Sequence, residues 1–159
     1  MAAAAIDREG FYITTKGERS HFHKREFKCR CGRCAFTDVS AKLIDNLEAL
    51  RLTLGVPLTV TSGIRCPEHN QRVGGARFSK HMPDGNGVGH AADVTTAFRT
   101  PVELYLWWRC VEIGGGCGLY SRWLHVDDRD DRTEWVERGE ASTQAIGDFI
   151  SHATMRELV

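Results

Sequence analysis

The sequence has no excess of charge of either sign, because 21 lysine and arginine residues balance 21 aspartate and glutamate residues. Bulk charge therefore indicates no attraction to an anionic polymer such as nucleic acid. The chain also lacks any apolar run near the roughly 20 residues that a membrane-spanning helix needs. We therefore expect neither a nucleic-acid partner nor a membrane partner.

The N-terminus lacks the features of a secretory signal. The stretch from Met1 to Ile6 is apolar, but it is short and has neither a basic start nor a long apolar middle. We therefore expect the chain to be made in the cytoplasm.

Internal repeats and low-complexity linkers are absent as well, and 159 residues fit one domain with its own core. The expected organisation is an N-terminal arm over 1–21, a domain over 22–140 and a C-terminal helix over 141–159.

Six cysteines are present, which in a cytosolic protein are more typical of thiols or metal ligands than of disulfides. Cys31 and Cys34 have the two-residue gap of a zinc knuckle, and Cys29 stands beside them. A structural zinc ion needs four ligands, and the sequence has no second cysteine pair at that gap. Cys66 or a nearby histidine can complete such a site, and buried free thiols are the alternative.

The pattern of apolar residues predicts a mixture of helices and strands that do not alternate regularly, which favours an α+β fold with a small antiparallel sheet and flanking helices. Trp107 and Trp108 are expected on the core face of a helix that Thr100 caps. Residues 76–90 hold three glycines and are expected to form a long ordered loop. The expected helices cover about 40–54, 66–73 and 100–113, and the expected strands about 58–61, 91–95, 117–120 and 123–127.

His81, Asp93 and His125 stand out among the histidines and acids because of their placement. His81 opens the glycine-rich loop, and the other two lie on or at the start of expected strands, where a rigid backbone fixes the side chains in advance. Two imidazoles and one carboxylate are a catalytic zinc set that leaves a fourth position for water. No helix carries the paired histidines of the common metalloprotease motif.

An ordered set of short motifs runs from residue 22 to about residue 130. The set is Glu26-Phe27-Lys28-Cys29-Arg30-Cys31-Gly32, Leu50-Arg51, Gly55-Val56-Pro57, Thr61-Ser62-Gly63-Ile64-Arg65, His69-Asn70, Val73-Gly74-Gly75, Ser79-Lys80-His81, Gly89-His90-Ala91-Ala92-Asp93, Gly118-Leu119-Tyr120 and His125-Val126-Asp127. In this order the motifs resemble the zinc D-alanyl-D-alanine peptidases, whose fold is shared with the hedgehog signalling domain. No single motif is specific to this family, but the whole set in this order is strong evidence of the resemblance.

The resemblance implies a role for individual residues. His81, Asp93 and His125 occupy the positions of the Zn²⁺ ligands. Arg65 resembles the arginine that points at the substrate and stabilises developing negative charge, a task that suits a permanently charged guanidinium. Ser79 is expected to bond a metal ligand or the substrate.

The spacing between the first two ligand positions departs from the family pattern. The segment from His81 to Asp93 is five residues longer than in the family, with the extra residues within Met82 to Val88. Because the insertion lies in a loop, His81 can still reach the metal. The insertion also makes His90 a rival ligand.

The general base is the second departure. Several relatives carry an acid three residues before the last zinc histidine, where this chain has Arg122, which cannot accept a proton. Asp127 is the best substitute because it lies two residues after His125, on the same face of the expected strand. Orienting a metal ligand or bonding Arg65 is its alternative role.

The resemblance implies a zinc peptidase that hydrolyses D-amino-acid-containing bonds of a peptidoglycan stem peptide, as carboxypeptidase or endopeptidase. Trp123 and His69 are expected to contribute to substrate binding; His69 packing or capping a turn is the alternative. A compact domain without a secretion signal resembles phage or prophage endolysins, which act on the cell wall after release or as a virion component. The alternatives are a catalytically weak zinc-containing module that binds the wall and a structural virion protein.

Overall fold

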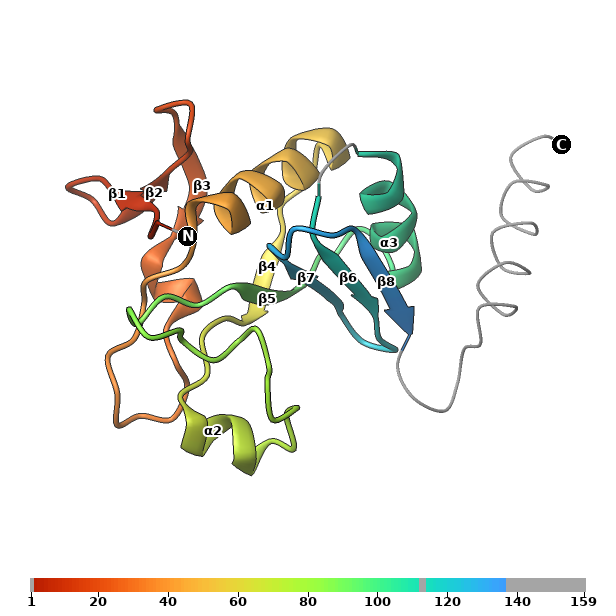
Figure 1. The fold of residues 1–159 in the computed structure, drawn as a ribbon. Helices are drawn as coiled ribbons and strands as arrows, with labels where there is room; N and C mark the ends of the chain where they lie inside the picture. Colours follow the sequence, from red (N-terminus) through yellow and green to blue (C-terminus); the bar gives the residue numbers. More distant parts are fainter. Residues whose placement is uncertain (1, 112–113, 137–159) are drawn as a thin grey trace, which may run out of the picture.

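A five-stranded sheet of order β4-β5-β7-β6-β8 forms the centre of the molecule (Figure 1). The structure is a computed structural model, and it describes residues 2–111 and 114–136. Neighbouring strands are antiparallel except for β8, which pairs with β6 in parallel. The expected small antiparallel sheet is therefore present, with an additional parallel edge strand that we did not predict. The strands are β4 (Thr59–Ser62), β5 (Ala91–Thr95), β6 (Gly116–Leu119), β7 (Leu124–Asp127) and β8 (Thr133–Val136).

The helices α1 (Ala41–Leu54) and α3 (Pro101–Cys110) pack beside this sheet (Figure 1). Helix α1 begins where the Ser40 side chain accepts a hydrogen bond from the backbone N–H of Leu43, and it ends at Gly55, which adopts a left-handed φ of 65°. Thr100 and Glu103 form the capping box that begins α3. Both helix starts confirm the expectation from sequence.

Helix α3 differs from the expected helix in two respects. It ends at Cys110, because Val111 is already extended, whereas the sequence pattern suggested an end near residue 113. Trp108 is fully buried, but Trp107 is 40% exposed. The expectation that both tryptophans lie in the core was therefore wrong for Trp107, since neighbouring residues of a helix point about 100° apart.

Alternation along β5 and β7 separates the core from the functional face of the sheet. Ala92, Val94, Leu124 and Val126 all belong to the hydrophobic core. The residues between them, Asp93, His125 and Asp127, therefore point to the opposite face. All of these strand residues are buried, on the functional face as well as on the core face.

The N-terminal residues, expected to form an arm over 1–21 for which we predicted no strand, form a second, three-stranded antiparallel sheet. It consists of β1 (Ala5–Ile6), β2 (Phe11–Ile13) and β3 (Arg19–His23), and it leads into the 3-10 helix η1 (Lys24–Phe27). Its strands are short, so their alternation was a weak signal. Tyr12 and Phe22 nevertheless point inward and are almost fully buried.

The short helix α2 (Pro67–Arg72) lies at the far end of the molecule from α1 (Figure 1). The expected ordered loop, residues 76–90, follows it without a helix or strand of its own. No helix in the described part of the chain is long and apolar enough to cross a membrane. The expected C-terminal helix over 141–159 lies outside the described residues.

Candidate metal centre

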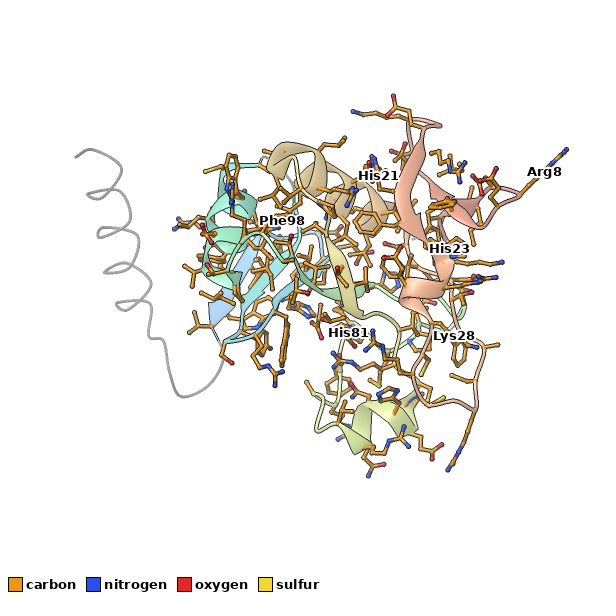
Figure 2. All side chains as sticks on the ribbon, turned by 180° about the vertical axis from the view of Figure 1, so that it is seen from behind. Arg8, His21, His23, Lys28, His81 and Phe98 are labelled. Atoms are coloured by element: carbon orange, nitrogen blue, oxygen red, sulfur yellow. The ribbon has the colours of Figure 1, made fainter. Side chains whose placement is uncertain are left out.

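Three polar side chains from separate segments meet on the functional face of the sheet. Asp93 on β5 and His125 on β7 are directly opposite each other in the antiparallel ladder. His81 comes from the loop over 76–90, and its backbone carbonyl accepts a 2.8 Å hydrogen bond from the N–H of Arg65. Figure 2 shows His81 near the middle of the molecule, between the sheet and the part that carries α2. The structure thus brings the three predicted ligands together.

The three donor atoms form a nearly equilateral triangle. His81 Nε2 lies 3.1 Å from Asp93 Oδ1 and 3.1 Å from His125 Nδ1, and His125 Nδ1 lies 3.0 Å from Asp93 Oδ1. Zinc bonds of about 2.0–2.1 Å in a tetrahedral arrangement separate the ligand atoms by about 3.3 Å. All three residues are buried. The residues present therefore fit a zinc ion in both donor type and spacing.

The hydrogen bonds on the far side of each ring fix which nitrogen faces the centre. His81 Nδ1 lies 2.7 Å from the carbonyl oxygen of Gly63, which can only accept, so this nitrogen carries the hydrogen. His125 Nε2 lies 3.3 Å from Asp127 Oδ2 and donates in the same way. In the neutral rings, His81 Nε2 and His125 Nδ1 therefore point lone pairs toward Asp93. Three acceptors at this distance repel one another unless a cation or a proton lies between them.

The pKa values of the two histidines at the centre are shifted in opposite directions. Burial lowers the pKa of His81 below its ordinary value. Burial also acts to lower the pKa of His125, but hydrogen bonds and charge from Asp127 and Asp93 outweigh it, and the pKa of His125 is raised. Burial acts to raise the pKa of Asp93, yet its contacts with His125 and His81, which donate to it when their rings are protonated, hold it below the usual range. Asp93 is therefore ionised at neutral pH, which is the form of a carboxyl group that binds a metal cation.

Arg65 lies against the metal centre from the end of β4. Its Nε donates a 2.8 Å hydrogen bond to Ser62 Oγ, and its Nη2 forms an ion pair with Asp93 Oδ2. The same Nη2 lies 3.3 Å from His81 Nε2. The guanidinium therefore touches the carboxylate through the oxygen that does not face the histidines, and it also lines the adjoining cavity.

Asp127 is fully buried and surrounded by donors. Its Oδ1 accepts from the backbone N–H groups of Gly116 at 2.9 Å and Arg129 at 3.1 Å, and from Arg129 Nε at 2.8 Å. Its Oδ2 accepts from Arg129 Nη2 at 2.6 Å and from His125 Nε2 at 3.3 Å. These contacts favour the alternative role that the sequence left open, in which Asp127 orients His125.

A cavity of about 510 Å³ opens beside the metal centre. Its walls include Ser79 and Trp123, whose predicted roles in binding are consistent with this position but stay predictions, and Trp123 stacks on Tyr120 with ring centroids 5.2 Å apart. Trp135 and Arg129 also line it, and sequence reasoning missed both. The only signal for Trp135 was a short Thr-Glu-Trp-Val stretch that we did not interpret as a strand.

Two other histidines lie away from the centre. His90 Nδ1 lies 2.8 Å from Asp128 Oδ2, and His90 Nε2 lies 3.2 Å from Asp84 Oδ2. His90, the rival ligand, is therefore engaged elsewhere, and the candidate ligand group holds His81 instead. His69, predicted to contact substrate, is placed with its Nδ1 3.5 Å from Cys29 Sγ, and the cavity walls in the described part of the chain do not include it.

The α+β fold and this donor set are those of a small metallopeptidase domain. The chain belongs to the peptidase M15 family, whose model matches residues 20–127, well over half of the chain. The match confirms the resemblance to the zinc D-alanyl-D-alanine peptidases and the expectation of a metal-dependent peptidase. A search of curated proteins found no match. The hedgehog-like fold and the phage context stay predictions.

Proposed function

We propose that the chain is a zinc peptidase that hydrolyses D-amino-acid-containing bonds in the stem peptide of peptidoglycan. The observation that carries this proposal is the convergence of three buried acceptor atoms, from His81, Asp93 and His125, at the edge of an open cavity. Membership of the peptidase M15 family supports a peptide as the substrate.

The residues around the centre have separate roles in the proposed amide hydrolysis. His81, Asp93 and His125 would hold the ion, which when bound supplies Lewis acidity that polarises a carbonyl and activates water at neutral pH. Arg65 is positioned to hold the substrate or to stabilise the negative charge that develops on the carbonyl oxygen. Its ion pair with Asp93 keeps the guanidinium directed at the reacting centre.

The walls of the cavity suit an anionic peptide. Arg65, Lys80 and Arg129 line it, and although Arg65 and Arg129 pair with Asp93 and Asp127, the basic lining side chains outnumber the acidic ones by one. Trp123 adds an aromatic surface, and Phe78 at the rim is 86% exposed. Carboxylates attract such basic groups, and a stem peptide carries them at its D-alanyl end and on its acidic side chain. This complementarity supports a wall peptide over a neutral or basic one.

The general base stays a prediction. Asp127 was expected in that role because Arg122 stands where relatives have an acid, and Arg122 is an exposed residue here. The donors that surround Asp127 leave its oxygens fully engaged, which supports the orienting role instead. An alternative function follows from the same observation: a zinc-containing module that binds wall peptide and turns it over weakly.

A set of matched peptides tests the proposal. Zinc-loaded protein is incubated with a stem pentapeptide ending in D-Ala-D-Ala, with the same peptide amidated at its C-terminus, and with one ending in L-Ala-L-Ala. Release of D-alanine from the first peptide alone would identify a carboxypeptidase, and cleavage of cross-linked wall fragments would identify an endopeptidase. Binding of the D-peptide without cleavage of either the pentapeptide or the cross-linked fragments, at full zinc occupancy, would contradict the peptidase and support the binding module.

The Arg65→Ala variant tests the role of the guanidinium in the same assay. We expect zinc to stay bound while turnover falls about 10²–10³-fold, the cost typical of losing one group that stabilises a developing oxyanion. Arg65→Lys keeps the charge without the fork and is expected to recover part of the rate. Normal kinetics in Arg65→Ala would show that this residue takes no part in the reaction.

Action on the wall after release, or as a virion component, stays a prediction.

A further inference from the structure

Four cysteine side chains converge outside the histidine-aspartate centre. Cys29, Cys31 and Cys34 lie on the loop that follows η1, and Cys66 immediately precedes α2. Their sulfur atoms all lie within 4.8 Å of one another. The sequence left open whether Cys66 or a histidine completes the knuckle, and the structure brings Cys66 to it. Lys28, at the start of the cysteine-bearing loop, marks this region in Figure 2.

The spacing of the sulfur atoms suits one ion at their centre. Zinc–sulfur bonds of about 2.3 Å in a tetrahedron place the sulfur atoms about 3.8 Å apart. The Cys31 and Cys34 sulfurs are 3.3 Å apart and no two of the four sulfurs are more than 4.8 Å apart, a range that includes the required value. All four cysteines are free thiols in the structure.

Backbone N–H groups point at two of the sulfur atoms. Cys31 Sγ accepts from the N–H groups of Arg33 and Cys34, each at 3.2 Å, and Cys29 Sγ accepts from the N–H of Cys66 at 3.3 Å. Hydrogen bonds of this kind stabilise the thiolate, which is the form that binds metal. Gly32 makes the tight turn possible, because its φ of 75° is strained for a residue with a side chain.

The surroundings offset the charge that a tetrathiolate site would carry. Four thiolates around Zn²⁺ have a net charge of −2, and the same loop contributes Lys28, Arg30 and Arg33. His69 Nδ1 lies 3.5 Å from Cys29 Sγ and can donate to it. A cluster of thiols with basic neighbours and backbone donors is the environment in which cysteines ligate metal rather than pack as apolar side chains.

We propose that Cys29, Cys31, Cys34 and Cys66 bind a second zinc ion with a structural role. Four protein ligands leave no open position, which is the mark of a structural rather than a catalytic zinc site. The ion would join the irregular loop after η1 to the start of α2. Cys66 directly follows Arg65, so the same ion would anchor the chain where the Arg65 side chain reaches Asp93.

Zinc content of the full chain, purified under reducing conditions, tests the second site separately from the first. We expect two zinc ions per chain in the wild type, one in His125→Ala, one in Cys31→Ser and none in the double variant. Cys110→Ser is the matched control, because Cys110 is exposed on α3 and outside the cluster; it should keep two. One zinc in the wild type that is lost in His125→Ala would overturn the proposal without affecting the first site.

X-ray absorption at the zinc edge covers the case in which Cys31→Ser does not fold. The measurement uses zinc-loaded His125→Ala, in which all four cysteines remain. We expect only sulfur ligands at about 2.3 Å, without the shorter bonds of about 2.0–2.1 Å that nitrogen and oxygen ligands make. Nitrogen or oxygen ligands at the remaining ion, or a Cys31–Cys34 disulfide that persists in reduced, zinc-supplemented protein, would reject the tetrathiolate site.

Discussion

The ring of Trp135 lies over the ring of His125, with centroids 5.2 Å apart and planes inclined by 52°. Gly118 stands between them in the sheet, paired with His125 on one side and with Trp135 on the other. A Cβ atom at Gly118 would lie 2.5 Å from the indole ring. The missing side chain thus creates the space through which an edge-strand residue reaches a metal ligand.

Replacing Trp135 tests whether this contact belongs to the substrate site. We expect Trp135→Ala to keep its zinc, because the indole is not a ligand, and to lose about three- to tenfold in kcat/KM on the D-Ala-D-Ala peptide, the range expected for one aromatic contact. Trp107→Ala is the control, since Trp107 is exposed on α3 and is not among the residues lining the cavity. Equal losses in both variants would assign Trp135 a merely structural role.

The sequence was sufficient to select the three candidate ligands that the fold brings together, but not to predict this wall of the cavity. His81, Asp93 and His125 were chosen because each stands in a short motif and because Asp93 and His125 lie on expected strands; the antiparallel pairing that places these two opposite each other came from the structure. Trp135 was not, since β8 is a four-residue edge strand whose parallel pairing with β6 depends on contacts distant in the sequence. Local alternation carries no information about such a partner.

The full engagement of Asp127 was also beyond sequence reasoning. Strand alternation correctly placed it on the face of His125. Its other partners, the guanidinium of Arg129 and the N–H of Gly116, come from a turn and from a neighbouring strand, and only the folded structure shows them. The second sheet was missed for a related reason, because strands of two and three residues give too little periodicity to detect.

Alanine variants of the proposed ligands test the metal centre directly. His81→Ala, Asp93→Ala and His125→Ala are each expected to lose zinc from this site and peptidase activity together. His90→Ala is the control, because the ring of His90 is engaged by Asp84 and Asp128 instead. Metal analysis decides between them: loss of this zinc in His90→Ala but not in His81→Ala would show that the wrong histidine was chosen.

The Asp127→Asn variant separates an orienting carboxylate from a general base. Because Asp127 receives the Nε2–H of His125, we expect zinc affinity to fall about 10–100-fold, the usual effect of removing a partner of a metal ligand. Activity at saturating zinc should then recover in large part. The measurement is turnover against zinc concentration. Turnover that stays lost with zinc fully bound would instead support Asp127 as the base.

In the metal-free protein, His125 should titrate at a pH above the ordinary value for histidine and His81 at a pH below it. The pKa of His125 is raised and that of His81 is lowered from the ordinary value of 6.5. The charged form of His125 therefore stabilises the metal-free fold below the unfolded pKa, and this contribution is lost as the pH rises through the higher folded pKa. Ring signals followed by NMR against pH check both directions, and zinc should abolish both titrations. Coincident titrations would contradict the hydrogen-bond assignment.

Gly63 contacts both the His81 ring of the metal centre and the backbone of Phe27, so a change at this position should affect zinc binding and stability together. Its carbonyl accepts from His81 Nδ1 at 2.7 Å, and a Cβ atom at this position would lie 2.4 Å from the Cα of Phe27. The backbone of Phe27 cannot move away easily, because its carbonyl accepts a 2.9 Å hydrogen bond from the N–H of Ile64. Any adjustment must therefore shift Gly63 itself, and with it the orientation of the His81 ring.

We expect Gly63→Ala to lower the free energy of unfolding by about 1–3 kcal/mol, as overpacking in a filled interior does, and to weaken zinc binding as well. Gly85→Ala is the matched control, because a Cβ atom there meets no other atom within 4 Å. It should change the free energy of unfolding by less than about 0.5 kcal/mol. Urea unfolding with and without zinc measures both effects. If Gly63→Ala matched Gly85→Ala in stability and zinc affinity, the backbone contact with Phe27 would not constrain the His81 ring.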